Sequence, residues 1–239
     1  MEINRKGFTL VELVVGIIVL GIVVAGVIPI LGSMEVKSVE PLFQVKADLL
    51  AHRIYNQIKQ RDFDENSDHS GGECRCGENI SHYGVSVCNL KDCTVASDFG
   101  PDGDEKINLK QEFFNDVDDF DTGSLCSTAT LSGICLSKNN NCKPSDAKCL
   151  NSIDAILTNV CGSSDNDCLI PAKFFVDSTH NISCITDSSD IACSSYDGYF
   201  VNIHVSYREL SGVSVKNIKI VVVSPRYDSF DYQFIRGNY

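Results

Sequence analysis

The sequence contains none of the common local signatures of catalysis or nucleotide binding. G-x-S-x-G, H-E-x-x-H and G-x-x-x-x-G-K-[ST] are all missing from its 239 residues. The five histidines are scattered along the chain and form no cluster. These absences predict a protein that is not an enzyme.

Basic residues are also scarce. The 20 Lys and Arg residues are outnumbered by 32 Asp and Glu, which gives a formal net charge of −12 at pH 7. Because nucleic acids are bound chiefly through basic contacts to phosphate, this balance argues against a nucleic-acid partner. It also argues against binding to an anionic membrane surface, and it is compatible with cations or basic partners.

Cysteine is absent before Cys74, and no C-x-x-C pair occurs in the chain. Zinc ribbons require such pairs, so a metal–thiolate site is disfavoured. An even count of 12 cysteines in an exported chain is typical of disulfides, although a sequence cannot give their pairing. The candidates are Cys74, Cys76, Cys88, Cys93, Cys126, Cys135, Cys142, Cys149, Cys161, Cys168, Cys184 and Cys193.

Charge is absent from residues 13–31, which as a helix of about 1.5 Å rise per residue would be roughly 29 Å long, enough to span a bilayer core. Arg5 and Lys6 precede this run, so we expect the N-terminus to stay inside the cell and the remainder to be exported.

Glu12 lies immediately before the uncharged run, at the start of the apolar helix. Because an ionisable group in lipid is costly, Glu12 should have a partner and a function. A secretory signal peptide would be cut after the apolar run, where 32–34 is a poor site.

The stretch Lys6-Gly7-Phe8-Thr9-Leu10-Val11-Glu12-Leu13, followed by the apolar run, resembles the type IV prepilin signature. The resemblance implies that a prepilin peptidase cleaves after Gly7 and methylates the new amino terminus at Phe8. It further implies that Glu12 neutralises the terminal amine of a neighbouring pilin in the fibre. The protein would wait in the inner membrane with a periplasmic head and then enter an extracellular pilus.

Further stretches are similar to minor pilins of the mannose-sensitive haemagglutinin (MSHA) type IV pilus. They are residues 38–47, 63–67, 74–78, 114–120 and 236–239. This resemblance implies a structural and assembly subunit that supports pilus biogenesis and surface attachment. Two alternatives stay open: a pseudopilin of a type II secretion system, and a pilus-borne adhesive module that uses a Cys-rich insert.

The chain order predicts an α+β protein with a type IV pilin fold and a disulfide-rich insertion. Apolar residues at steps of three and four continue the helix beyond the membrane, and period-two stretches at the C-terminal end predict an antiparallel meander against which the helix packs. The predicted segments are 1–7 as leader, 8–33 as membrane and assembly helix, 34–60 as amphipathic continuation and 61–239 as globular head. Within the head we expect a loop over 62–84, a Cys-rich insertion over about 123–195 with one short helix at 152–160, and strands over 199–207, 217–223 and 229–235.

Acidic residues concentrate between positions 98 and 121. Asp116, Asp118, Asp119 and Asp121 could supply several of the six to eight oxygens that calcium prefers, which makes calcium a candidate cofactor. The resemblance to pilin-like proteins also favours calcium, because some secretion pseudopilins bind calcium in a loop near their sheet. The spacing does not meet the EF-hand pattern. The alternative is a solvated acidic loop in which the aspartates cap turns.

Overall fold

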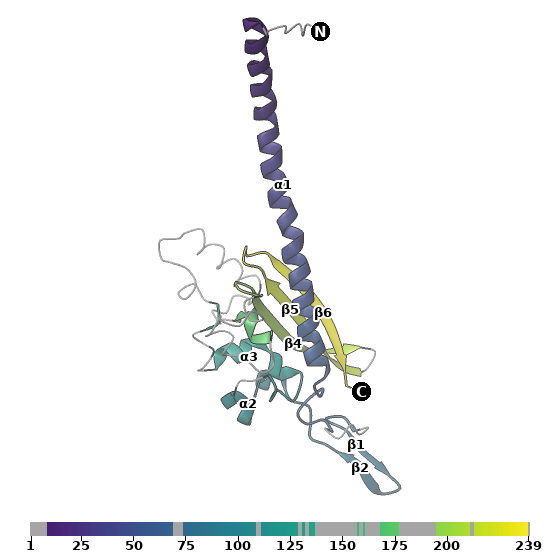
Figure 1. The fold of residues 1–239 in the computed structure, drawn as a ribbon. Helices are drawn as coiled ribbons and strands as arrows, with labels where there is room; N and C mark the ends of the chain where they lie inside the picture. The colour runs from purple at the N-terminus through teal and green to yellow at the C-terminus, as the bar shows by residue number, and fades with distance from the viewer. Residues whose placement is uncertain are drawn as a thin grey trace, which may run out of the picture. The chain divides into compact units, whose positions relative to one another are not determined.

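The computed structural model describes residues 9–68, 74–108, 111–128, 131, 134–136, 157, 160, 168–176, 195–210 and 213–238. The chain forms two units, Met1–Lys46 and Ala47–Tyr239. Helix α1 (Leu10–Lys59) begins in the first unit and ends in the second, and it runs without interruption through Pro29 and Pro41 (Figure 1).

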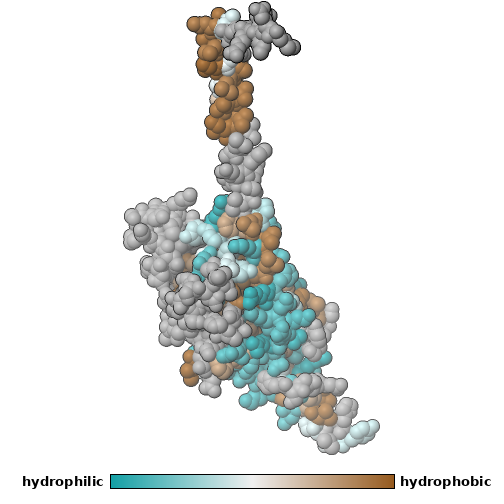
Figure 2. Space-filling model, viewed as in Figure 1, coloured by the Kyte–Doolittle hydropathy of each residue, from teal (hydrophilic) through white to brown (hydrophobic). Residues whose placement is uncertain are grey.

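The first unit consists of the N-terminal part of α1. Its segment Leu10–Ile28 is long and apolar enough to cross a membrane, and none of it is buried inside the protein. Figure 2 shows hydrophobic residues covering this part of the helix. Since a helix satisfies its own backbone hydrogen bonds, such a segment suits a lipid environment, where no water can do so.

The second unit contains a four-stranded antiparallel sheet with the order β3-β4-β5-β6. The strands are β3 (Ile170–Pro171), β4 (Phe200–Leu210), β5 (Val213–Val223) and β6 (Ser229–Gly237). Ile220 of β5 lies opposite Ile203 on one side and Tyr232 on the other. The three predicted strands are therefore present. Each extends past one of its predicted ends, because backbone pairing continues into residues outside the stretches on which the prediction rested.

The end of α1 packs on this sheet. Ala47, Leu50, Ala51, Ile54 and Ile58 are fully buried. Tyr55 stacks on Phe234 of β6 with ring centroids 4.0 Å apart. The predicted α+β architecture, a long helix on an antiparallel meander, is confirmed and is compatible with a type IV pilin fold.

A hairpin of β1 (Asn79–His82) and β2 (Val85–Asn89) stands where a loop was predicted. Tyr83 and Gly84 connect the strands with φ of 54° and 77°, the double positive-φ turn that matches the twist of a hairpin. The disulfides Cys74–Cys88 and Cys76–Cys93 fasten the hairpin and its flanks. The loop prediction was wrong over 79–82, because this strand is only four residues long and mostly polar, and it is held by a turn and disulfides.

The described part of 123–195 contributes to the core of the head. It contains most of α3 (Thr122–Ser127), together with β3 and the 3-10 helix η3 (Ala172–Phe175). Leu125, Leu169 and Phe174 are fully buried. The expectation of a loop-rich insert was therefore wrong for these segments. They contain few apolar side chains, but these side chains are large and are buried in the core. Leu157 and Val160, within the predicted helix 152–160, are helical and pack against a cluster that includes Leu136 and Leu169.

Three short helices complete the head. They are η1 (Ala96–Asp98), α2 (Gly103–Asn108) and η2 (Asp118–Phe120). They carry or flank most of the acidic stretch. The four candidate calcium ligands are all buried, so they are not solvated as the alternative expected. Its other part holds, because Asp116, Asp119 and Asp121 accept hydrogen bonds from backbone N–H groups of the adjoining turns.

Candidate functional site

Glu12 lies in the first turn of α1, where its backbone N–H lies 3.3 Å from Thr9 Oγ1. Its side chain is exposed, and no ion pair of Glu12 exists among the described residues. The carboxylate is thus presented on the surface of an apolar helix and is accessible to another molecule. Gly7 and Phe8 lie outside the described residues, so the cleavage site stays a prediction.

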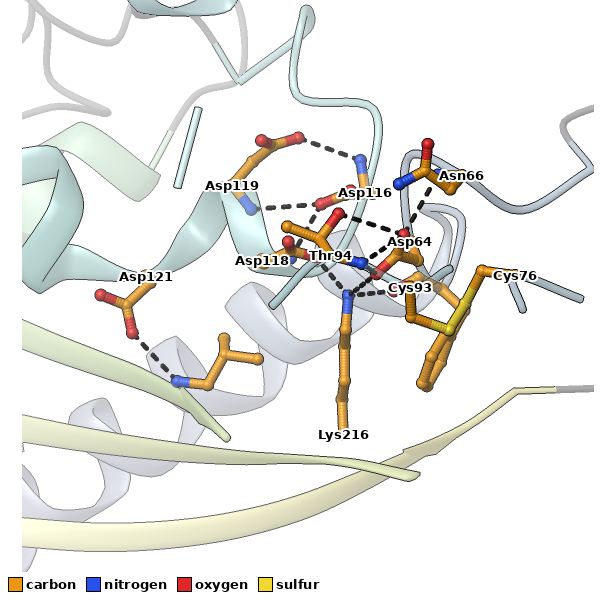
Figure 3. A network of polar contacts seen from close by, with 12 residues as sticks. Asp64, Asn66, Cys76, Cys93, Thr94, Asp116, Asp118, Asp119, Asp121 and Lys216 are labelled. Carbon is orange, nitrogen blue, oxygen red and sulfur yellow. Dashed lines mark hydrogen bonds and ion pairs between the residues drawn. A yellow bond between two sulfur atoms is a disulfide. The ribbon is translucent and has the colours of Figure 1, made fainter. Parts of the chain in front are cut away.

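A second polar site surrounds Lys216 on β5. Lys216 is completely buried, and its ammonium donates hydrogen bonds to Phe63 O at 2.6 Å and to Asp64 Oδ2 at 3.1 Å. Asp118 Oδ1 also contacts Nζ directly. Figure 3 shows the lysine side chain pointing from the sheet into a group of carboxyl groups. Lys216, Asp64 and Asp118 form what we term the buried lysine cluster.

Asp64 is held in place by several donors. Asn66 N lies 3.1 Å from Oδ1, Thr94 N lies 3.0 Å from Oδ2, and the Tyr207 hydroxyl lies 3.1 Å from Oδ2. Burial alone would raise the pKa of Asp64, but the Lys216 charge and these hydrogen bonds outweigh it and leave the pKa below its usual value. Asp64 is therefore ionised at neutral pH.

Three aromatic rings enclose the Lys216 ammonium. Nζ lies 4.8 Å from the ring centroid of Phe63, 5.2 Å from that of Phe99 and 5.6 Å from that of Tyr207. Such contacts attract a cation to the ring faces and exclude water from it. This cluster was not predicted from the sequence, because its members are far apart in the chain. A lysine within an apolar strand pattern was the one available signal.

The structure brings three of the four candidate calcium ligands together. Asp116 Oδ1 accepts from Asp118 N at 2.9 Å, and Asp119 Oδ2 accepts from Asp116 N at 3.0 Å. Asp121 lies apart from them (Figure 3). It caps α3 by accepting from Ser124 N at 3.1 Å and bonds to Val205 N of β4 at 3.1 Å.

Burial changes the protonation of this acidic group. Burial, followed by the charges of Asp119 and Asp118, raises the pKa of Asp116 to about 9. Burial, together with the charge of Glu105, raises the pKa of Asp119 to about 8, against the lowering effect of its backbone hydrogen bonds. Both carboxyl groups therefore hold protons at neutral pH, because too few cations face them.

A cavity of about 500 Å³ lies beside these groups. Lys91 is the one basic residue in its lining. The acidic residues in the lining are Glu65, Asp92, Asp98, Asp102, Glu105, Asp116, Asp118 and Asp119. The cavity is thus strongly negative, and a cation would be favoured in it.

All seven described cysteines are disulfide-bonded. Besides the two pairs at the hairpin, Cys126 pairs with Cys135. Asp64, Cys76 and Cys93 bring possible ligand atoms within 4.8 Å of one another, but both sulfurs belong to one disulfide and cannot act as thiolates. The candidates Cys142, Cys149, Cys161, Cys184 and Cys193 lie outside the described residues.

Comparison with known proteins supports the N-terminal site. Residues 3–28 match the family model described as the prokaryotic N-terminal methylation motif. No curated protein and no solved structure matches the chain. The motif implies processing by a prepilin peptidase and assembly with other pilins through a membrane-anchored helix. Together, the motif, the apolar helix and the α+β head support a type IV pilin-like protein.

Proposed function

We propose that the protein is a minor pilin of an MSHA-type type IV pilus, similar to MshD. It is cleaved after Gly7, methylated at Phe8, held in the inner membrane with a periplasmic head, and then assembled into an extracellular fibre. As a non-enzymatic subunit it supports pilus biogenesis and surface attachment. The observation that carries this proposal is Glu12, exposed on an apolar helix within the methylation motif.

Cleavage is tested at the scissile bond. The Gly7→Ala variant should accumulate as an uncut precursor in the membrane, because the peptidase then meets a side chain before the cut. An immunoblot would show one band of precursor size, and mass spectrometry would find residues 1–7 attached. A Thr9→Ser variant, altered on the other side of the cut, should be processed normally. A mature-sized Gly7→Ala band contradicts the assigned site.

The type II secretion pseudopilin is the closest alternative, because it shares the motif and the fold. The genes beside this one separate the two functions, since pilus and secretion systems are encoded with different partner subunits. Loss of surface fibres on deletion of the gene supports the pilus subunit. Intact fibres with accumulation of secreted enzymes in the periplasm would support the pseudopilin.

The adhesive alternative assigns ligand binding to the Cys-rich region. Deleting all of 123–195 would remove the buried residues Leu125 and Phe174, so the loss of attachment would follow from unfolding. Attachment per fibre, measured on purified fibres with and without this subunit, is the informative quantity. Unchanged attachment per fibre excludes the adhesive role.

We also propose that the acidic cavity binds calcium, with Asp116 and Asp119 among its ligands. Their raised pKa values support this, because protons at present neutralise charge that a cation would neutralise instead. Asp121 and Asp118 contribute less, since they bond to Val205 N and to Lys216.

Calcium should raise the thermal midpoint of the detergent-solubilised chain, and the increase should grow as the pH rises from about 6 to about 9, because calcium must displace the two protons. The midpoints with calcium, with magnesium and with chelator give the measurement. Asp116→Asn should lower the increase and weaken its pH dependence, because only the proton on Asp119 is then left for calcium to displace. Equal midpoints in calcium and chelator contradict the proposal.

A further inference from the structure

The buried lysine cluster has the composition of a site for covalent bond formation. A primary amine, Lys216 Nζ, contacts the Asp118 carboxyl group directly. A second carboxyl group, that of Asp64, lies 3.1 Å from the same nitrogen. The side chains of Lys216 and Asp64 are 0% exposed and that of Asp118 is 4% exposed. When an amine reacts with a carboxyl group held in contact with it, the reaction is intramolecular and the effective concentration is very high.

We propose that Lys216 and Asp118 join through an isopeptide bond between Nζ and Cγ, with Asp64 relaying the protons. The bond would link β5 to the 3-10 helix η2, in addition to the disulfides of the head.

The reaction is a condensation that needs no oxidant and no further reactant. Asp64 accepts a proton from the Lys216 ammonium, and the nitrogen lone pair then forms a bond to Asp118 Cγ. A carbon–oxygen bond of Asp118 breaks and its electron pair leaves with the oxygen. Asp64 delivers two protons in turn from the nitrogen to that oxygen, which departs as water. Asp64 ends ionised as it began, and one ion pair has become one neutral amide and one water.

The surroundings favour the product in two ways. The rings of Phe63, Phe99 and Tyr207 around Nζ create a low-dielectric environment, in which a neutral amide is cheaper to bury than a lysine–carboxylate ion pair. Asp64 loses its cation in the product, but its carboxylate keeps the hydrogen bonds from Asn66 N, Thr94 N and the Tyr207 hydroxyl. Asp118 also lines the cavity described above, so the released water has space into which it can leave.

A nearby ion pair provides an internal control. Lys219, also on β5, lies 3.1 Å from Asp231 of β6, but these side chains are 35% and 54% exposed. This pair has no buried relay carboxyl group among its described contacts, and water surrounds it. It should therefore remain an ion pair although its geometry resembles that of Lys216 and Asp64.

The test is peptide mapping of the full chain, extracted from membranes in detergent, then reduced, alkylated, denatured and digested with trypsin. An amidated Lys216 is not cut, so peptides 111–138 and 209–219 should appear joined, with the mass of one water molecule lost. Fragmentation should place the link on Lys216 and Asp118. Lys219 should be cut, and no link to Asp231 should appear.

Two variants separate the bond from other causes. Lys216→Arg keeps the cation but lacks the reactive amine, so the joined peptide should be absent. Asp64→Asn keeps the contact between Lys216 and Asp118 but lacks the relay, and it should release the linear peptides 111–138 and 209–216. Recovery of only these linear peptides from the wild-type chain overturns the proposal. A joined peptide at the wild-type level in Asp64→Asn overturns the role of Asp64.

Discussion

The Glu12→Val variant should enter the membrane in wild-type amounts and be lost from the fibre. Glu12 is exposed within the apolar span Leu10–Ile28, and the part of the chain that the structure describes offers it no ion pair. In lipid such a carboxylate is penalised by about 2.5–3.5 kcal/mol on insertion scales, so removing it makes insertion easier. Assembly, by contrast, loses the one charge that a neighbouring terminal amine can neutralise.

The measurement compares the membrane fraction with sheared fibres by immunoblot. Incorporation, taken as the ratio of fibre to membrane signal, should fall at least tenfold for Glu12→Val, which corresponds to about 1.4 kcal/mol of lost contact energy. Leu13→Val, an apolar change at the next position, should incorporate normally. Glu12→Asp should retain part of the incorporation because it keeps a shorter carboxylate. Wild-type incorporation of Glu12→Val would show that assembly does not use this charge.

Replacing Lys216 with methionine should cause the largest loss of stability in the head. Methionine approximates the lysine stem but removes the nitrogen that holds the buried Asp64 and Asp118 carboxyl groups, both in the ion pair that the structure shows and after the proposed bond has formed. Removal of one partner from a buried ion pair costs about 3–5 kcal/mol, a large share of the stability of a typical domain. Thermal or denaturant unfolding of the solubilised chain measures the loss.

Lys219→Met is the matched control, because Lys219 lies on the same strand in a half-exposed ion pair with Asp231. Exposed pairs contribute about 0–1 kcal/mol, so this variant should unfold close to the wild type. Where Lys216 is a cation, the difference in free energy of unfolding between the wild type and Lys216→Met should narrow as the pH falls below about 4, because the Lys216 charge helps to hold the pKa of Asp64 below its usual value. Equal stability of Lys216→Met and Lys219→Met would show that the cluster contributes little.

The N-terminal helix could be predicted without a structure. The length and purity of the apolar run predict a membrane helix, and one carboxylate beside a basic leader predicts a segment for processing and assembly. These signals are local, because lipid imposes the same requirement on every residue of the span. The C-terminal strands could also be predicted from the sequence, because the alternation of apolar and polar residues along a strand indicates which side faces the core.

The head gave weaker signals. The β1–β2 hairpin was missed because its strands are only four and five residues long, and a turn with two positive φ angles and two disulfides hold them together. The described parts of 123–195 looked like a loop-rich insert, yet Leu125, Leu169 and Phe174 are buried in the core. Composition averages over a segment, whereas burial depends on where each large side chain lies.

By itself, the amino-acid order determined the long apolar helix, its acidic residue and the C-terminal meander. Only the tertiary structure decided which carboxylates are buried, which of them share a cavity and which one contacts Lys216. The reason is physical: hydrophobic periodicity acts between neighbours along the chain, whereas the energy of a charge depends on solvent exposure and on partners that folding brings from distant positions. Asp64, Asp118 and Lys216 come from three separate segments, and only the folded head brings their charged groups into contact.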